Sequence, residues 1–264
     1  MTYEVYAVKY AEQTARTQGD NYMFPDDHAA VDPIDFYMWL IRGEGRVILV
    51  DTGFDAVEGE ARGRPIRLDP GEALKPFGLK PEDVTEIIVT HLHFDHAGGL
   101  HLFPNAQLHL QAAEMAFATG PCMCHMVMRH AYTVGHVVEA VKRLYSGKVT
   151  FHDGDSEIAD GITVHRIGGH TKGMQAVRVR TQAGWLVLAS DAAHFYGNML
   201  NEIPFPLVVD VEEMLTGFDT LRSLASAPKL IVPGHDPLVR DYFPLAMADH
   251  ITRLDVGPTT DPKL

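Results

Sequence analysis

Four apolar segments of this chain each run into a residue that can bind a metal ion, and this pattern constrains the fold more than any other feature. The segments are EIIVT before His91, ITVHRIGG before His170, WLVLAS before Asp191 and LIVPG before His235. Short apolar runs with many β-branched residues predict buried strands. Because strand ends on one edge of a sheet converge in space, we expect these four residues to meet at one rim.

The first of these ends carries an unusually dense set of ligand types. Residues 91–96 read HLHFDH, which places three imidazoles and a carboxylate within six positions. They can face one place only if the segment is a loop. His91 and His93 can then reach one metal, while Asp95 and His96 reach a second metal about 3.5–4 Å away.

The later strand ends supply what this motif lacks. His170 and His235 add two nitrogens, and Asp191 adds a carboxylate whose two oxygens can bridge two metals. A single histidine is more often an ordinary hydrogen-bonded imidazole than a ligand. The repeated placement of such residues after successive strands instead favours a two-metal site.

The remaining pattern predicts mixed helices and strands. We expect strands at residues 3–11, 36–41, 46–50, 86–90, 106–110, 162–167, 175–181, 185–189 and 230–232, and helices at 70–77, 111–146 and 211–224. The helical stretch 111–146 is interrupted near Gly120-Pro121. Because it is rich in methionine between Met115 and Met128, we interpret it as a buried helical hairpin, with a pliable apolar wall for a substrate as the alternative.

A long loop is expected between the first two strands. Residues 17–34 carry Tyr22, Met23 and Phe24 beside Pro25, and loops of this length are usually functional or disordered. The aromatic side chains favour a binding role for this segment.

Composition excludes several classes of protein. A formal net charge of −13 and the lack of a basic run argue against nucleic acid as a partner. No apolar stretch is long enough to cross a bilayer, so we expect no membrane association. The two cysteines, Cys122 and Cys124, are too close in the chain for an ordinary disulfide and are predicted to be free thiols.

Length and the N-terminal residues complete this outline. A chain of 264 residues is predicted to form one domain over 1–264. Its start, MTYE, lacks the basic and apolar regions of a secretory signal, which favours a cytoplasmic location. The sequence does not decide between a monomer and a homodimer.

With these residues in view, the sequence resembles the metallo-β-lactamase superfamily. The resemblance extends from Asp51-Thr52-Gly53 to Gly234-His235-Asp236 and includes the specific motif THLHFDHAGG. It implies an αββα four-layer sandwich, in which two mixed β-sheets are flanked by helices. It implies the metal ligands His91, His93 and His170 on one ion, Asp95, His96 and His235 on the other, and Asp191 between them. Asp51 would support this rim without touching the metal.

Within that superfamily the sequence is most similar to the N-acyl homoserine lactonases. True β-lactamases generally lack the bridging aspartate, and RNase Z-like members need a basic surface that this chain lacks. The lactonases often have a tyrosine three residues after the bridging aspartate. Here that position is His194, and Tyr196 follows two residues later. Either side chain could donate a hydrogen bond to a substrate carbonyl, and His194 could alternatively pack against the rim.

The resemblance therefore predicts a hydrolase with two divalent metal ions, zinc being the preferred choice. A hydroxide shared by the metals would attack a small lactone, and Asp95 or Asp191 would relay a proton to the leaving alkoxide. An acyl homoserine lactone substrate would imply quorum quenching. Alternatives are a two-metal ester, thioester or phosphodiester hydrolase, and a metal protein without hydrolytic activity.

Overall fold

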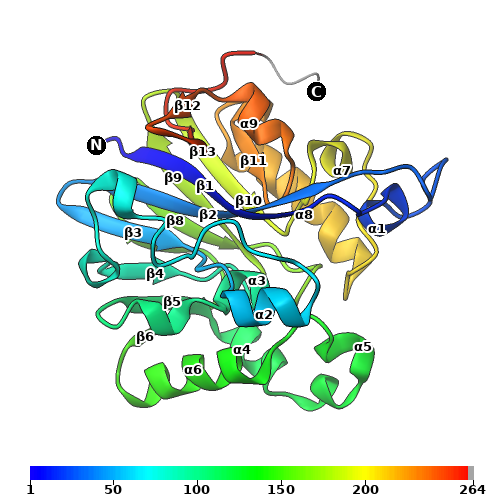
Figure 1. The fold of residues 1–264 in the computed structure, drawn as a ribbon, viewed down its shortest axis with the longest axis horizontal. Coiled ribbons are helices and arrows are strands. Elements are labelled where there is room, and N and C mark those ends of the chain that lie inside the picture. The colour runs from blue at the N-terminus through cyan, green and yellow to red at the C-terminus, as the bar shows by residue number, and fades with distance from the viewer. Residues whose placement is uncertain (261–264) are drawn as a thin grey trace.

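The computed structural model describes residues 1–260 and contains two β-sheets packed face to face, with helices outside both sheets (Figure 1). The strands are β1 (Glu4–Gln13), β2 (Ile34–Gly43), β3 (Arg46–Val50), β4 (Glu86–Ile88), β5 (Gln107–Gln111), β6 (Val149–His152), β7 (Ser156–Ala159), β8 (Ile162–Arg166), β9 (Gln175–Thr181), β10 (Gly184–Ser190), β11 (Ile231–Pro233), β12 (Leu245–Ala246) and β13 (Ala248–Arg253). The α-helices are α1 (Gln18–Asn21), α2 (Ala56–Ala61), α3 (Phe94–Ala97), α4 (Ala112–Ala118), α5 (Met126–Arg129), α6 (Val134–Tyr145), α7 (Tyr196–Leu200), α8 (Val211–Leu224) and α9 (Leu238–Tyr242).

Short 3₁₀ turns complete the elements. They are η1 (Lys75–Phe77), η2 (Pro81–Asp83), η3 (Leu100–Leu102), η4 (Pro121–Cys124) and η5 (Pro228–Leu230). In the part of the chain that the structure describes, no helix is both long and apolar enough to cross a membrane.

Both sheets are mixed. The larger sheet has the order β12-β13-β1-β2-β3-β4-β5-β6, and the smaller has the order β11-β10-β9-β8-β7. Strands β3 to β6 run parallel, as do β10 and β11, whereas the other neighbours are antiparallel. The αββα sandwich predicted from the sequence is therefore confirmed.

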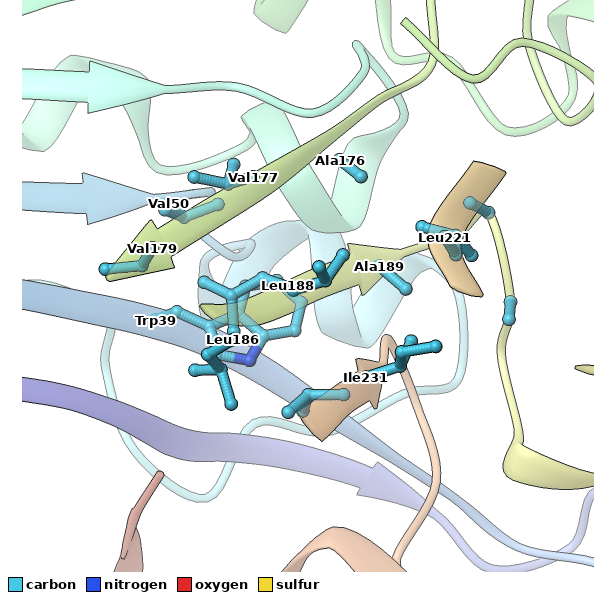
Figure 2. Packing of buried hydrophobic residues seen from close by; sticks show 14 of the residues in the cluster. Trp39, Val50, Ala176, Val177, Val179, Leu186, Leu188, Ala189, Leu221 and Ile231 are labelled. Carbon is cyan, nitrogen blue, oxygen red and sulfur yellow. The ribbon is translucent and has the colours of Figure 1, made fainter. Parts of the chain in front are cut away.

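Strand β2 shows why this sequence forms a central layer. Tyr37 and Trp39 point into the core between the two sheets, while Phe36 and Met38 point into a second core under the helices. Successive side chains of a strand face opposite ways, so a run that is apolar at every position can be buried on both faces. Figure 2 shows Trp39 packed among residues of β9, β10 and β11 in the first of these cores.

Helices cover the two outer faces. Helix α6 packs near β6 on the larger sheet, and α8 packs against β10 of the smaller sheet (Figure 1). Asp210 caps α8 by accepting a hydrogen bond from the Glu213 backbone N–H, and Met214 and Phe218 are buried in the inner core. The predicted helix over 211–224 is confirmed.

Two predicted segments differ from the structure. Residues 70–77 form turns and the 3₁₀ turn η1 instead of a helix, because Pro76 and Gly78 limit it to a single turn. The stretch 111–146 is helical with the predicted break at Gly120-Pro121, but its central part is not buried: Met126 is 73% exposed. The cysteines in this part are free and exposed.

Other elements gave no clear signal in the sequence. These are α1 within the predicted loop 17–34, α2, the edge strands β6 and β7 of the two sheets, and the C-terminal strands β12 and β13. The strands among them are two to six residues long and partly exposed. A short half-buried strand lacks the continuous apolar run that identifies a buried one.

Candidate metal centre

The loops that follow four strands meet at one edge of the sandwich. The loop after β4 holds residues 91–96, and the loops after β8, β10 and β11 hold His170, Asp191 and His235. The first loop belongs to the larger sheet and the other three to the smaller sheet. The structure thus brings together all seven side chains that the sequence analysis named as ligands, and every one of them is buried.

The first group contains three imidazoles. His91 Nε2 lies 3.0 Å from His93 Nδ1, and His170 Nε2 lies 2.9 Å from His93 Nδ1 and 3.2 Å from His91 Nε2. Nitrogen ligands at 2.0–2.1 Å from a tetrahedral zinc ion lie about 3.3 Å from one another. The three nitrogens therefore have the spacing of a metal site.

The second group combines a carboxylate with two imidazoles. Asp95 Oδ2 lies 3.7 Å from His96 Nε2 and 3.8 Å from His235 Nε2. The sequence predicted an open loop for residues 91–96. In the structure, Asp95 and His96 lie instead in the short helix α3. The helix begins at Phe94, so His91 and His93 precede it while Asp95 and His96 are carried on its first turn.

Asp191 lies between the two groups and presents one oxygen to each. Its Oδ1 is 3.3 Å from His96 Nε2 and 3.1 Å from His235 Nε2, whereas its Oδ2 is 3.4 Å from His170 Nε2. This is the arrangement expected of a carboxylate that bridges two cations.

The protonation of the two ligand groups differs. Burial lowers the pKa of His96, but the carboxylates of Asp191, Asp95 and Asp51 outweigh this effect and raise that pKa well above its ordinary value. Burial, followed by the neighbouring His96 and His93, holds the pKa of His91 well below its ordinary value, and burial does the same to the pKa of His93. Neutral imidazoles with converging lone pairs repel one another unless a cation lies between them. His96 Nε2 and Asp191 Oδ1 are buried and have no hydrogen-bond partner within residues 1–260. The donor set and these unpaired atoms fit divalent metal ions.

Hydrogen bonds from the backbone and from Asp51 fix the ligand rings. His96 Nδ1 donates to Asp51 Oδ2 at 2.7 Å, which leaves its Nε2 facing the cavity. Asp51 also accepts from the Thr90 backbone N–H and hydroxyl. Ser190 Oγ lies 3.3 Å from the same carboxylate. Asp51 and Ser190 both have left-handed backbones, with φ of 59° and 47°, a strain that surrounding contacts must hold in place.

Two further ligands are oriented by carbonyl oxygens. His170 Nδ1 donates to the Leu207 carbonyl at 2.6 Å, and His235 Nδ1 donates to the Asp35 carbonyl at 2.8 Å. Each bond fixes the tautomer and directs Nε2 towards the cavity.

Beneath the first group lies a buried carboxylate that the sequence analysis did not identify. Glu114 in α4 accepts hydrogen bonds from four donors, which are the Leu92 and Gly173 backbone N–H groups and the Thr171 and Tyr132 hydroxyls. It therefore joins the loop that carries His91 to the loop that follows His170. In the sequence Glu114 is one polar residue in a helical segment, which predicts an exposed position.

Two glycines allow these loops to approach closely. A Cβ at Gly173 would lie 2.1 Å from the Glu114 backbone nitrogen, and Gly169 has φ of +79° with a Cβ position 2.6 Å from Met214. The first position has no room for a side chain, and the second also requires the left-handed backbone that glycine adopts at little cost.

The structure places His194 and Tyr196, the two candidate hydrogen-bond donors to a substrate carbonyl, in different surroundings. His194 lines the metal cavity, its Nε2 lies 2.8 Å from Asp191 Oδ2, and its ring stacks on Phe205 with centroids 3.4 Å apart. Tyr196 is buried against Tyr242 and is not among the residues that line the cavity.

The cavity above the ligands has a volume of about 60 Å³, room for a few water molecules. It is lined by Arg16, Ile34, Phe36, Arg62, Arg64, His93, Phe94, Asp95, His130, Ala131, Asp191, His194, Leu207 and His235. The loop 17–34 and the methionine-rich segment contribute little to this lining. Tyr22 packs against Phe195, Phe24 is 90% exposed, and Met126 faces a separate surface pocket. The arginines of the lining come from separate segments and gave no signal in the sequence.

Comparison with known proteins agrees with this geometry. Residues 36–235, most of the chain, match the family described as the metallo-beta-lactamase superfamily. An N-acyl homoserine lactonase from a Bacillus species is 30% identical over 241 residues, which cover 81% of this chain and 86% of the relative.

Solved structures with the same fold include two lactonases. One is an N-acyl homoserine lactone hydrolase with the product N-hexanoyl-L-homoserine at its catalytic metal centre, with a TM-score of 0.72, 25% identity, and coverage of 90% of this chain and 95% of the other. The other is AidC, a dizinc quorum-quenching lactonase with a TM-score of 0.66 and 19% identity, covering 89% and 88% of the two chains. At that identity the second similarity supports the fold alone.

Proposed function

Because this chain belongs to the metallo-beta-lactamase superfamily and is a metal-dependent hydrolase, we propose that it opens the ring of a small lactone, an N-acyl homoserine lactone or a similar ester. The reaction would use water held between two divalent metal ions. The observation that carries this proposal is the position of Asp191, which presents one oxygen to each of two groups of buried ligands.

The metals are proposed to be zinc ions held by the seven ligands. One ion would be held by His91, His93 and His170, and the other by Asp95, His96 and His235, with Asp191 between them. When bound, two such ions lower the pKa of a shared water and supply a hydroxide nucleophile at neutral pH.

Side chains of the protein would then transfer a proton from the attacking water to the leaving group. Attack of the water oxygen on the carbonyl carbon forms a tetrahedral intermediate. Its collapse breaks the ring C–O bond, and the leaving alkoxide needs a proton. Asp95 and Asp191 line the cavity and are the carboxylates in position to transfer that proton from the attacking water.

His194 is assigned a role through Asp191 rather than as a carbonyl donor. Burial holds the pKa of His194 well below its ordinary value, which favours a neutral ring. Its Nε2 proton is donated to Asp191, which leaves Nδ1 as an acceptor without a proton to offer. His194 would thus hold the Asp191 carboxylate, and uptake of a proton at Nδ1 would allow the Nε2 proton to pass to Asp191. Tyr196, which lies outside the cavity lining, is given no role in this scheme.

Elemental analysis combined with a substrate panel tests the proposal. We expect about two metal ions per chain and metal-dependent hydrolysis of lactones, with turnover of thioesters and phosphodiesters several orders of magnitude lower. A protein that holds its metals but prefers another bond type would instead be a different two-metal hydrolase. Metal-loaded protein without activity on any ester bond would contradict the proposal.

A further inference from the structure

Three arginines line the metal cavity of a chain whose formal net charge is −13. They are Arg16, from the segment before α1, and Arg62 and Arg64, which follow α2. Side chains of one sign gathered in a cleft concentrate ions of the opposite sign there, even when the rest of the molecule repels them. The same lining also contains Asp95 and Asp191, which belong to the buried ligands, whereas the three arginines are partly exposed. We call the part of the lining formed by these arginines the cavity mouth.

Arg62 has a structural explanation. Its guanidinium pairs with Glu58, donates to the Thr133 hydroxyl and donates to the His130 carbonyl oxygen. These partners satisfy its charge and attach the segment after α2 to the segment before α6. Nothing more is required to explain why this arginine is present.

Arg64 has no comparable partner. Among residues 1–260 its side chain makes no ion pair and donates no hydrogen bond, although its Nε is buried. Its guanidinium lies over the Phe94 ring, 5.0 Å from the centroid. The face of an aromatic ring compensates a cation only in part.

Arg16 is also without a carboxylate partner in the described chain. It donates to the Asn21 side-chain oxygen and to the Asp20 carbonyl oxygen, both of which are neutral acceptors. The Asp20 carboxylate is bound instead by the Thr17 hydroxyl and backbone N–H. Two arginines of the same cavity are therefore held in partly buried positions without an ion pair.

This arrangement is costly in the absence of a ligand. Burial lowers the pKa of Arg16, and the nearby charge of Arg64 lowers it further. The carboxylates that act on both arginines from the cavity side include Asp95, which the proposed function assigns to a metal. A further opposite charge that reaches both arginines would therefore stabilise this pair of partly buried like charges.

We propose that the substrate of this hydrolase carries a carboxylate in addition to the ester bond that is cleaved, and that Arg16 and Arg64 bind this carboxylate at the cavity mouth. The guanidinium group presents parallel N–H donors that match the two oxygens of a carboxylate. Ile34, Phe36 and Leu207 line the same cavity and offer an apolar surface to the rest of the molecule. This inference rests on the proposed function, whose substrate class it narrows from small lactones to anionic lactones.

A matched pair of substrates tests it. The probes are 5-oxotetrahydrofuran-3-carboxylate and the corresponding 3-carboxamide, which share a ring and a size but differ in charge. We expect the wild-type enzyme to have a kcat/KM at least about tenfold higher for the carboxylate, since hydrogen bonds between two charged groups are roughly twice as strong as neutral ones. Arg16→Met and Arg64→Met should each reduce this preference mainly through KM, and the double variant should abolish it.

Controls separate binding from folding. Arg67→Met removes the same charge from an exposed arginine that does not line the metal cavity, and it should leave the preference unchanged. Circular dichroism spectra and metal contents equal to those of the wild type would show that the Arg16 and Arg64 variants fold. Equal turnover of both probes by the wild type, or equal losses on both probes in the variants, would overturn the inference while leaving lactone hydrolysis in place.

Calorimetric titration with glutarate gives a readout that needs no turnover. We expect the dissociation constant of glutarate to increase at least about tenfold in the double variant relative to wild type and to Arg67→Met. Glutarate binding that depends on both arginines, together with no lactone turnover, would contradict the proposed function but support the anion site. Binding that is independent of the arginines would overturn the anion site.

Discussion

The floor and the mouth of the metal cavity are built in different ways. On the floor, the ligands lie in segments that follow strands, and the second ring nitrogens of His96, His170 and His235 are fixed by Asp51 and by two carbonyl oxygens. At the mouth, Arg16 and Arg64 lie on segments outside the sheets and have no ion pair in the described chain. We therefore expect the floor to determine which reaction is possible and the mouth to determine which molecules undergo it.

The largest effect is expected from Asp191→Asn. The substitution keeps the shape of the side chain but removes the charge that faces both ligand groups. We expect bound metal to fall and kcat/KM to drop by roughly 10³-fold, beyond the 10- to 100-fold typical of residues that only support a ligand. Elemental analysis of the variant, together with its steady-state kinetics, measures both effects. Full metal content with normal activity would show that the floor does not depend on a bridging carboxylate.

His194 provides the next test. His194→Phe removes both the hydrogen bond to Asp191 and the proton acceptor, and we expect kcat to fall by about 10²-fold. His194→Gln can still donate to Asp191 but cannot exchange protons, so it should remain slow and have a changed pH–rate profile. If the glutamine variant regains full activity, His194 only positions the carboxylate.

Asp51→Asn tests the support beneath the floor. Without a carboxylate, the ring orientation and basicity of His96 are less well fixed. We expect metal affinity to fall about 10- to 100-fold while the folded structure is retained. Competition with a chelator would measure this loss, and an unchanged affinity would mean that Thr90 and Ser190 suffice to orient the ligand.

Glu114→Gln tests stability rather than chemistry. The amide can accept fewer of the four hydrogen bonds that Glu114 now receives, so unfolding free energy should fall by about 1–3 kcal/mol. Burial raises the pKa of Glu114, so the folded state binds its proton more tightly than the unfolded state does. This contribution is fully present below the unfolded pKa and is lost as pH rises through the folded pKa.

The measurement is urea unfolding across that pH range, in the presence of a chelator so that metal binding does not contribute. The wild type should lose stability with rising pH relative to the glutamine variant. A constant difference between the two proteins at all pH values would contradict the raised pKa.

The smallest effect is expected at the mouth, from Arg62→Met. Because the ion pair with Glu58 is only partly buried, we expect a loss of about 1 kcal/mol in unfolding free energy. Metal content should not change, since no ligand contacts Arg62. A variant that loses metal would show that the floor and the mouth are not independent.

The same contrast explains what the sequence could predict. The ligands His91, His170, Asp191 and His235 were identifiable because each directly follows a buried apolar run, and strand order places such ends together. Strand β2 was evident for a similar reason. Local pattern and three-dimensional position agree in these segments.

In other segments the local sequence pattern does not predict where a residue lies in the folded structure. Glu114 has the sequence surroundings of an exposed helical residue. In the structure it is buried and accepts hydrogen bonds from four donors in other segments. Arg16 and Arg64 share a cavity only because the chain folds back across the sheets, and no spacing rule relates them. The roles of Met126 and Phe24 were uncertain for the same reason, since an apolar residue in a loop can be covered or left in solvent.

One consequence follows from the origin of the ligand loops. Residues 91–96 extend from one sheet, and the other ligands extend from the second sheet, so ions bound between them would cross-link the two halves of the sandwich. Folding would then be thermodynamically linked to the free metal concentration, and the melting temperature would rise with supply. A cell starved of metal would lose the protein itself to proteolysis as well as its activity.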